Sequence, residues 1–143
     1  MNLIINTDGA SRGNPGPASY GYIVKSNTGV ILHQEGKVIG VTTNNIAEYT
    51  AVLKSLEYIE KKYIDKIPHE IEVIADSELI IRQLSGRYRV KNLRLKEIYY
   101  QIKQKEKTLG KIIYRSVPRK ENYIADRLAN IALDTAKKIP HLF

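Results

Sequence analysis

The feature that most constrains the fold is the order of the apolar patterns, because strand-like stretches come first and a long helical stripe follows them. Residues 2–8 form a short apolar run, and residues 20–26 and 30–40 are two strand-like stretches that a turn at 27–29 joins into a hairpin. Between residues 45 and 63, apolar side chains recur at helical spacing. They are Tyr49, Val52, Leu53, Leu56, Ile59 and Tyr63. Three strands are therefore expected before the first helix.

The rest of the chain alternates between strands and helices. The expected elements are a buried strand at 70–76, a short helix at 77–84 that Gly86 ends, a helix at 94–107, a strand at 111–117 and a helix at 121–138. The last helix carries small side chains that allow close packing on a sheet, at Ala125, Ala129, Ala132 and Ala136. This order predicts an α/β sandwich formed by one domain, residues 1–143.

The composition excludes several classes of protein. A hydrophobic share of 43% with 27% charged residues argues against a disordered chain, and no apolar run reaches the ~20 residues that span a bilayer. The first residues do not form a basic and then apolar signal segment, so we expect a cytoplasmic location without membrane contact. Because the chain has no cysteine, disulfides and cysteine-bound zinc are excluded, and any metal must bind oxygen or histidine.

The charge of the chain predicts a polyanionic partner. A formal net charge of +8 favours nucleic acid, since Lys and Arg that neutralise phosphates release counterions. The richest basic segment, residues 82–96, also contains Tyr88. The same segment is typical of a solvated helix and loop, so both interpretations stay open.

Four acidic residues stand near the predicted ends of elements. Asp8 ends the first strand and Asp76 ends the fourth. Glu48 lies in the first turn of one helix, and Asp126 lies near the start of another. Ligand crevices form outside the carboxyl ends of strands, so Asp8 and Asp76 share one crevice if their strands are parallel neighbours. Carboxylates are the ligands that Mg²⁺ or Mn²⁺ prefers, and such a site suits phosphodiester hydrolysis.

Each acid also has a purely structural explanation. Glu48 follows an asparagine at the spacing of a capping box, and for this residue alone a cap is favoured. Asp76 and Asp126 suit helix N-termini through the helix dipole, and Asp8 with the glycine after it is typical of a turn. No single acid therefore identifies a site.

Longer sequence blocks around the acids change this balance. In chain order they are DGASRGNPGPASYGYIV at 8–24, TTNNIAEYTAVLKSL at 42–56, ADSELIIRQL at 75–84 and ENYIADRLAN at 121–130. Together they closely resemble ribonuclease HI over essentially the whole chain. The resemblance implies a ribonuclease H-like fold, in which a five-stranded mixed sheet has strands 1–3 antiparallel and helices on both sides.

The resemblance also implies an activity. Members of this family are endonucleases that hydrolyse the RNA strand of RNA–DNA hybrids, with two Mg²⁺ or Mn²⁺ ions in the active site when substrate is bound. The products are 5′-phosphate and 3′-hydroxyl ends, and sequence preference is small. Carried over by motif, the metal-binding catalytic residues are Asp8, Glu48, Asp76 and Asp126. No protein partner is implied, and we expect a monomer.

Substrate contacts follow from the same resemblance. Asn14, Asn44 and Asn45 match positions that contact bases in the minor groove of the hybrid, and Ser11 lies in the loop that faces the RNA ribose. The wide minor groove of such a helix displays the 2′-hydroxyls that distinguish RNA from DNA. Two further residues match positions that hold a phosphate of the DNA strand, although both types are also common caps. The predicted substrate-binding set is Gly9, Ser11, Asn14, Thr43, Asn44, Asn45 and Asn92, of which Thr43 and Asn92 are the phosphate contacts.

The chain departs from the family pattern in two places. It has no tryptophan and resembles the shorter form that lacks a Trp-rich basic protrusion, so hybrid binding would depend on a basic loop containing Arg87, Arg89 and Lys91. The catalytic-loop histidine is missing from residues 116–122, and Arg119 has the nearest position. We predict that Arg119 acts as a charge, with a solvated loop residue as the alternative. The histidines elsewhere are expected to be structural or surface residues, at His33, His69 and His141.

Overall fold

The structure, a computed structural model, describes residues 1–139 and contains a five-stranded sheet with the strand order β3-β2-β1-β4-β5. The strands are β1 (Asn2–Ser11), β2 (Gly16–Ser26), β3 (Ile31–Thr42), β4 (Glu70–Ala75) and β5 (Lys111–Ser116). β2 is antiparallel to both β1 and β3, whereas β4 is parallel to both β1 and β5. The predicted mixed sheet with strands 1–3 antiparallel is confirmed.

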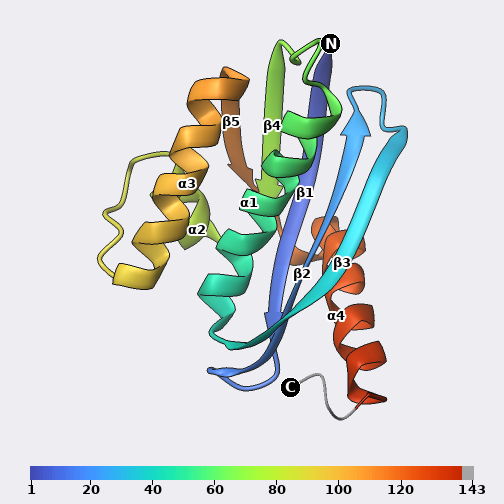
Figure 1. Cartoon of the computed structure of the whole chain (residues 1–143), viewed down its shortest axis with the longest axis vertical. Coiled ribbons are helices and arrows are strands. Elements are labelled where there is room, and N and C mark those ends of the chain that lie inside the picture. Colours follow the sequence, from blue (N-terminus) through green and yellow to red (C-terminus); the bar gives the residue numbers. More distant parts are fainter. Residues whose placement is uncertain (140–143) are drawn as a thin grey trace.

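Helices cover both faces of this sheet. They are α1 (Asn44–Lys62), α2 (Glu78–Leu84), α3 (Leu93–Leu109) and α4 (Tyr123–Lys137), and a short 3₁₀ helix, η1 (Arg119–Asn122), precedes α4. Figure 1 shows α1 and α3 side by side over one face, while α4 lies against the other face. The predicted order of elements is confirmed, with boundaries within a few residues. Among the described residues, no helix is long and apolar enough to cross a membrane.

The apolar stripe of α1 explains why this helix covers the sheet. Its buried side chains include Val52, Leu56 and Ile59, which pack in one cluster with Leu3 and Ile5 of β1. Burying each such side chain contributes roughly 1.5–3 kcal/mol to folding. The predicted helical stripe is therefore the inner face of α1.

Two glycines let helices approach the sheet from opposite faces at the same level. A Cβ on Gly9 of β1 would lie 2.3 Å from the backbone of Ala47 and Glu48 in α1. A Cβ on Gly21 of β2 would lie 2.4 Å from the carbonyl oxygen of Ala125 in α4. Because real side chains cannot come this close, any larger residue would push a helix away. The two helices consequently converge on β1 near Asp8, which pairs with Gly21.

The first strand is longer than its apolar run predicts. β1 continues through Asp8 and Gly9 to Ser11, because the antiparallel ladder with β2 extends to the pair Ser11 and Ala18. The prediction that Asp8 ends the strand is wrong, and so is the alternative that Asp8 and Gly9 form a turn. Asp8 is instead fixed inside a strand that is paired on both sides.

Candidate active site

Parallel pairing brings two of the acids to the same level of the sheet. Asn6 of β1 pairs with Ile74 of β4, so two residues further along Asp8 stands beside Asp76, the first residue after β4. The two strands are neighbours and parallel, as the shared crevice requires. This part of the site could be predicted from the general geometry of α/β sheets.

Glu48 reaches the same place from α1. The N-cap of this helix is Thr43, whose Oγ1 accepts a hydrogen bond of 3.3 Å from the backbone N–H of Ile46. Glu48 therefore lies beyond the first turn of α1, and that first turn contains no acidic residue. The capping-box explanation of Glu48 is wrong, because it needs the N-cap at Asn45, whereas the N-cap is Thr43.

Three carboxylates meet at this point. Oxygen atoms of Asp8, Glu48 and Asp76 lie within 4.8 Å of one another, and the first two residues are each only 4% exposed. Burial and the charges of Glu48 and Asp76 raise the pKa of Asp8 far above the usual carboxyl range. Burial and the charge of Asp76 also raise the pKa of Glu48. Ionisation of all three acids in the folded, metal-free protein therefore carries an electrostatic cost.

The donor set fits a hard divalent cation. Oε2 of Glu48 is buried and has no hydrogen-bond partner among the described residues, which is costly for a carboxylate unless a cation binds it. Oδ1 of Asp8 accepts a hydrogen bond of 3.0 Å from the N–H of Gly9, which fixes the direction of that carboxylate. Oxygen ligands with this charge are typical of Mg²⁺ or Mn²⁺ sites.

The fourth acid lies beside the three and is held by other partners. Asp126 is in the first turn of α4, as predicted, and its Oδ1 lies 3.4 Å from Nη2 of Arg119 and 3.2 Å from Nδ2 of Asn130. Burial raises the pKa of Asp76, and the nearby positive charge of Arg119 opposes that shift. Arg119 thus stands between two acids while 77% of its side chain stays exposed.

These residues line a hollow of about 460 Å³, which we call the acidic hollow. Of the predicted site residues, the structure brings eight to its wall: Asp8, Gly9, Ser11, Asn44, Glu48, Asp76, Arg119 and Asp126. The other four predicted residues, Asn14, Thr43, Asn45 and Asn92, do not line it.

Local structure accounts for three of those four residues. Oδ1 of Asn14 accepts a hydrogen bond of 2.9 Å from the backbone N–H of Asn44, so this loop residue lies directly beside the wall. Thr43 caps α1, and Asn92 caps α3 through a hydrogen bond of 3.1 Å from the N–H of Leu95 to its Oδ1. Their structural explanation is confirmed, which leaves their contact with phosphate as a prediction. Asn45 is exposed in the first turn of α1.

Three polar residues of the site were not singled out from the sequence. Ser77 lines the hollow and caps α2, and Asn130 lines it and contacts Asp126. Asn122 is buried and donates a hydrogen bond of 2.8 Å to the carbonyl of Thr7, which ties η1 to β1. Asn130 lies four positions after Asp126 on a helix, and this spacing was the available signal.

The two described histidines, His33 and His69, do not line the acidic hollow. The ring of His33 packs 3.7 Å from that of Tyr58, measured between centroids, and Nδ1 of His69 lies 3.2 Å from the N-terminal amino group. Both are structural contacts, as predicted. His141 lies outside the described residues.

Comparisons with known proteins agree with this geometry. A protein-family model described as reverse transcriptase-like matches residues 6–132. Ribonuclease H of Methylococcus capsulatus is 31% identical over 153 aligned residues, which cover 94% of this chain and 92% of that protein. The bifunctional protein Rv2228c of Mycobacterium tuberculosis is 40% identical over 137 residues, so this chain spans only 36% of that relative's length.

A solved structure is similar over nearly the whole chain. LC11-RNase H1, in complex with an RNA/DNA hybrid, has a TM-score of 0.91 and 41% identity, covering 94% of this chain and 98% of that one. In this chain α2 ends at Leu84 and α3 begins at Leu93, so only a short loop stands where a protrusion would be inserted. The chain belongs to the ribonuclease H family of nucleases, in the type 1 form that lacks the basic protrusion.

Proposed function

We propose that this chain is a metal-dependent endoribonuclease that hydrolyses the RNA strand of RNA–DNA hybrids. One observation carries the proposal, namely that Asp8, Glu48 and Asp76 meet within 4.8 Å where two parallel strands and a helix converge. The relative LC11-RNase H1 binds an RNA/DNA hybrid, which supports the same substrate class here.

The four carboxylates would hold two Mg²⁺ or Mn²⁺ ions when substrate is bound. Such ions activate water and stabilise the leaving oxygen. The chain's own contribution is to hold Asp8 and Asp76 on neighbouring strands and to supply the buried Glu48 from α1. Asn130 and Arg119 keep Asp126 turned toward the hollow.

Hydrolysis consumes one water molecule. The water oxygen bonds to phosphorus while the bond from phosphorus to the 3′ oxygen breaks, which leaves a 5′-phosphate and a 3′-hydroxyl. Arg119 lies on the wall of the hollow with most of its side chain exposed, so its guanidinium can hold a phosphate oxygen as a fixed positive charge.

Recognition depends on the groove of the hybrid. Ser11 and Asn44 line the hollow, Asn14 contacts Asn44, and Asn45 is the next residue of α1. They would contact the minor groove and its 2′-hydroxyls, which gives selection by sugar and shape with little sequence preference. The amide of Asn92 is a donor suited to a phosphate of the DNA strand. We expect one catalytic domain, residues 1–143, that acts as a monomer in the cytoplasm.

Cleavage of end-labelled hybrids with and without divalent metal tests the proposal. Cutting of the RNA strand is expected only with Mg²⁺ or Mn²⁺, and all-DNA duplexes should stay intact. A chain that binds the hybrid with metal but leaves it intact would be a binding module. Comparable cutting of DNA duplexes would instead indicate a DNA nuclease.

Sugar recognition has its own test. A hybrid with 2′-deoxy or 2′-O-methyl residues flanking the scissile phosphate should resist cleavage, because the 2′-hydroxyls that the protein would bind are absent or blocked. Unchanged cleavage of that substrate would remove the predicted role of the residues at the minor groove.

A further inference from the structure

A second hollow lies at the other end of α2 and is basic where the first is acidic. It measures about 760 Å³ and lies between the loop 85–92 and the first turns of α3. Three tyrosines line it, Tyr88, Tyr99 and Tyr100, and we call it the tyrosine hollow. Its lining residues also include four cations and no acid, and the cations are Arg87, Arg89, Lys91 and Lys96.

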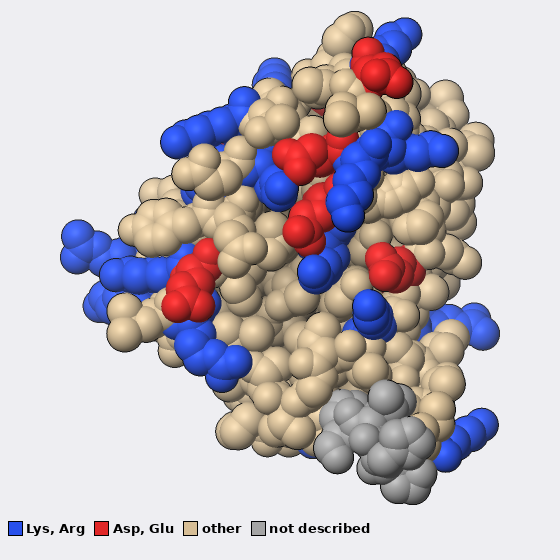
Figure 2. Space-filling model, viewed as in Figure 1, with Lys and Arg blue, Asp and Glu red and all other residues tan. Residues whose placement is uncertain are grey.

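The four cations are available to a ligand. Within residues 1–139, none of them lies within ion-pair distance of a carboxylate. Figure 2 shows Lys and Arg side chains gathered on the left of the molecule, where the loop between α2 and α3 lies in Figure 1, with an acidic side chain among them. Like charges close together on a loop repel each other, and an anionic ligand such as a phosphate removes that repulsion.

Two of the tyrosines, Tyr88 and Tyr100, are open to solvent but held in place. Tyr88 and Tyr100 are 48% and 62% exposed. The hydroxyl of Tyr88 accepts a hydrogen bond of 2.9 Å from Nη1 of Arg82, and the guanidinium lies 5.4 Å from the ring centroid. Tyr99 supports Tyr100 in an edge-to-face contact of 5.9 Å between centroids. Rings that are exposed and already positioned lose little entropy when a flat ligand stacks on them.

We propose that the tyrosine hollow binds an unpaired nucleotide that flanks the hybrid, with the base stacked on an exposed tyrosine and the phosphate beside the loop cations. Proteins bind single-stranded nucleic acids with aromatic rings interleaved with Lys and Arg, because every base has a face that can stack on such a ring. This inference rests on the proposed function in one respect, namely that the hybrid substrate supplies the unpaired nucleotide.

The place of the hollow in the fold supports this ligand. α2 begins beside Ser77, which lines the acidic hollow, and ends at Leu84, just before the tyrosine hollow begins at Gly86. A helix of this length spans about 10 Å. That length corresponds to about three nucleotide steps of a stacked strand. A strand leaving the hybrid near the cut can therefore reach the tyrosines.

The first test uses a single-stranded oligonucleotide that carries a fluorescent adenine analogue, whose emission falls when the base stacks. The native protein should quench it, and Tyr100→Leu should weaken binding by roughly 5-fold to 100-fold, the usual size of one stacking contact. Tyr123→Leu is the matched control, since Tyr123 is also 62% exposed but lines a different hollow, on α4. An abasic oligonucleotide keeps the phosphates and should bind as weakly to the native protein as the intact one binds to Tyr100→Leu.

The second test connects the site to catalysis by comparing kcat/KM for a blunt hybrid with that for hybrids carrying an RNA or a DNA extension. An extension should raise kcat/KM in the native protein and in Tyr123→Leu but not in Tyr100→Leu. The extension that raises kcat/KM more, RNA or DNA, identifies the strand that supplies the unpaired nucleotide.

Cleavage of blunt hybrids without quenching would overturn this inference and leave the proposed function standing. Quenching without any cleavage would support this inference and overturn the proposed function. Equal binding of abasic and intact oligonucleotides would also overturn it, because only charge would then be recognised.

Discussion

The acidic hollow and the tyrosine hollow gather charge of opposite sign in opposite ways. Asp8 and Glu48 are each 4% exposed and sit on a paired strand and a long helix, so their mutual repulsion cannot relax. Arg87 and Arg89 are exposed on a loop, where water screens them and the chain can move them apart. Electrostatic repulsion is therefore strong in the acidic hollow and weak in the tyrosine hollow.

This difference separates two functions. Rigid, buried charge of one sign suits a tightly placed cation, because the cation replaces the missing solvation and removes the repulsion. Exposed charge on a loop suits a long polyanion, whose phosphates need attraction more than exact placement. Substitutions in the acidic hollow should therefore change turnover and stability, whereas substitutions in the basic loop should change only binding.

The largest effect is expected from removing one charge of the acidic hollow. Asp8→Asn or Asp76→Asn should abolish metal-dependent cleavage while the fold stays intact, because a charge is removed with little change of volume. The melting temperature of the metal-free protein should rise, since the remaining acids repel each other less. Cleavage assays and thermal melts measure both effects. The control is Asp65→Asn, an exposed acid outside the site. Activity within a few-fold of the unsubstituted protein would disprove the site assignment.

Glu48→Gln should lose most activity with no loss of stability. The glutamine keeps the volume of the side chain, and the structure excludes a capping role because Thr43 caps α1. A buried amide is also easier to accommodate than a carboxylate near Asp8 and Asp76. The comparison of kcat with the free energy of unfolding in urea checks this expectation. Unchanged cleavage would show that Glu48 does not bind the metal.

The outcome for Glu48 shows how far the sequence alone could lead. Its membership of the site could be predicted from the TTNNIAEY block, but the start of its helix could not. The N–H of Asn44 is held by Asn14, thirty positions away in the sequence, and the Thr43 hydroxyl then acts as the cap. Local spacing alone carries no signal from such a distant partner.

The first strand shows the same limit. Its apolar run ends near Asp8, yet the ladder with β2 carries the strand to Ser11. Pairing with a neighbour, which is not a property of the run itself, decided where the strand ends. By contrast, the helical stripe of α1 followed from periodicity and is confirmed. The shared crevice of Asp8 and Asp76 was expected on the condition that their strands are parallel neighbours, and β1 and β4 meet that condition.

A smaller loss is expected from Arg119, which lies at the boundary between the two kinds of charge because it is exposed yet lines the acidic hollow. Arg119→Ala should lower kcat by about 10-fold to 100-fold, with a smaller effect on KM. Arg119→Lys should restore part of the loss. Arg119→His should restore activity with a new pH dependence near the imidazole pKa, because only histidine titrates in that range. Unchanged single-turnover rates for Arg119→Ala would make this residue an ordinary solvated side chain.

Repulsion in the acidic hollow should also appear as a pH dependence of stability. The raised pKa values of Asp8 and Glu48 mean that the folded metal-free protein keeps protons which the unfolded chain has released. The free energy of unfolding should therefore fall as pH rises above about 4, by up to about 1.4 kcal/mol per unit for each retained proton. Urea titrations over a pH series measure the slope.

Two additions identify the source of this slope. Mg²⁺ should restore stability at the higher pH values, because it binds the ionised carboxylates of the folded state only. Asp8→Asn should flatten the slope, and Asp65→Asn should leave it unchanged. A slope that Asp8→Asn does not alter would place the retained protons elsewhere.

The smallest effect is expected in the basic loop. Arg87→Ala combined with Arg89→Ala should weaken binding of a blunt hybrid only several-fold, while kcat stays the same and stability changes by less than about 0.5 kcal/mol. The diagnostic quantity is the slope of log affinity against log salt, which should become shallower by about 1 for each phosphate that the protein no longer neutralises.

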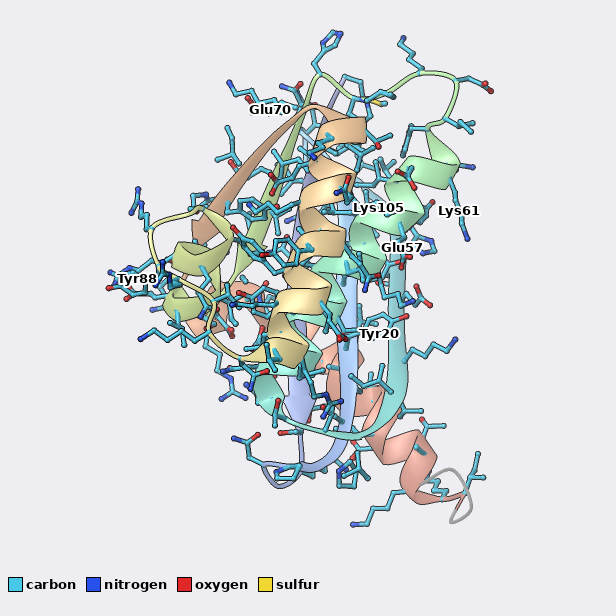
Figure 3. The ribbon with its side chains drawn as sticks, turned by 60° about the vertical axis from the view of Figure 1, so that its left-hand side comes forward. Tyr20, Glu57, Lys61, Glu70, Tyr88 and Lys105 are labelled. Atoms are coloured by element: carbon cyan, nitrogen blue, oxygen red, sulfur yellow. The ribbon has the colours of Figure 1, made fainter. Side chains whose placement is uncertain are left out.

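The control is Lys61→Ala combined with Lys62→Ala, which removes the same charge from the last turn of α1. Figure 3 shows Lys61 at the edge of the molecule opposite Tyr88. If binding depends on where the cations lie, only the loop variant changes the slope. If both variants change it equally, the net charge of +8 attracts the hybrid as a whole and the loop has no special role.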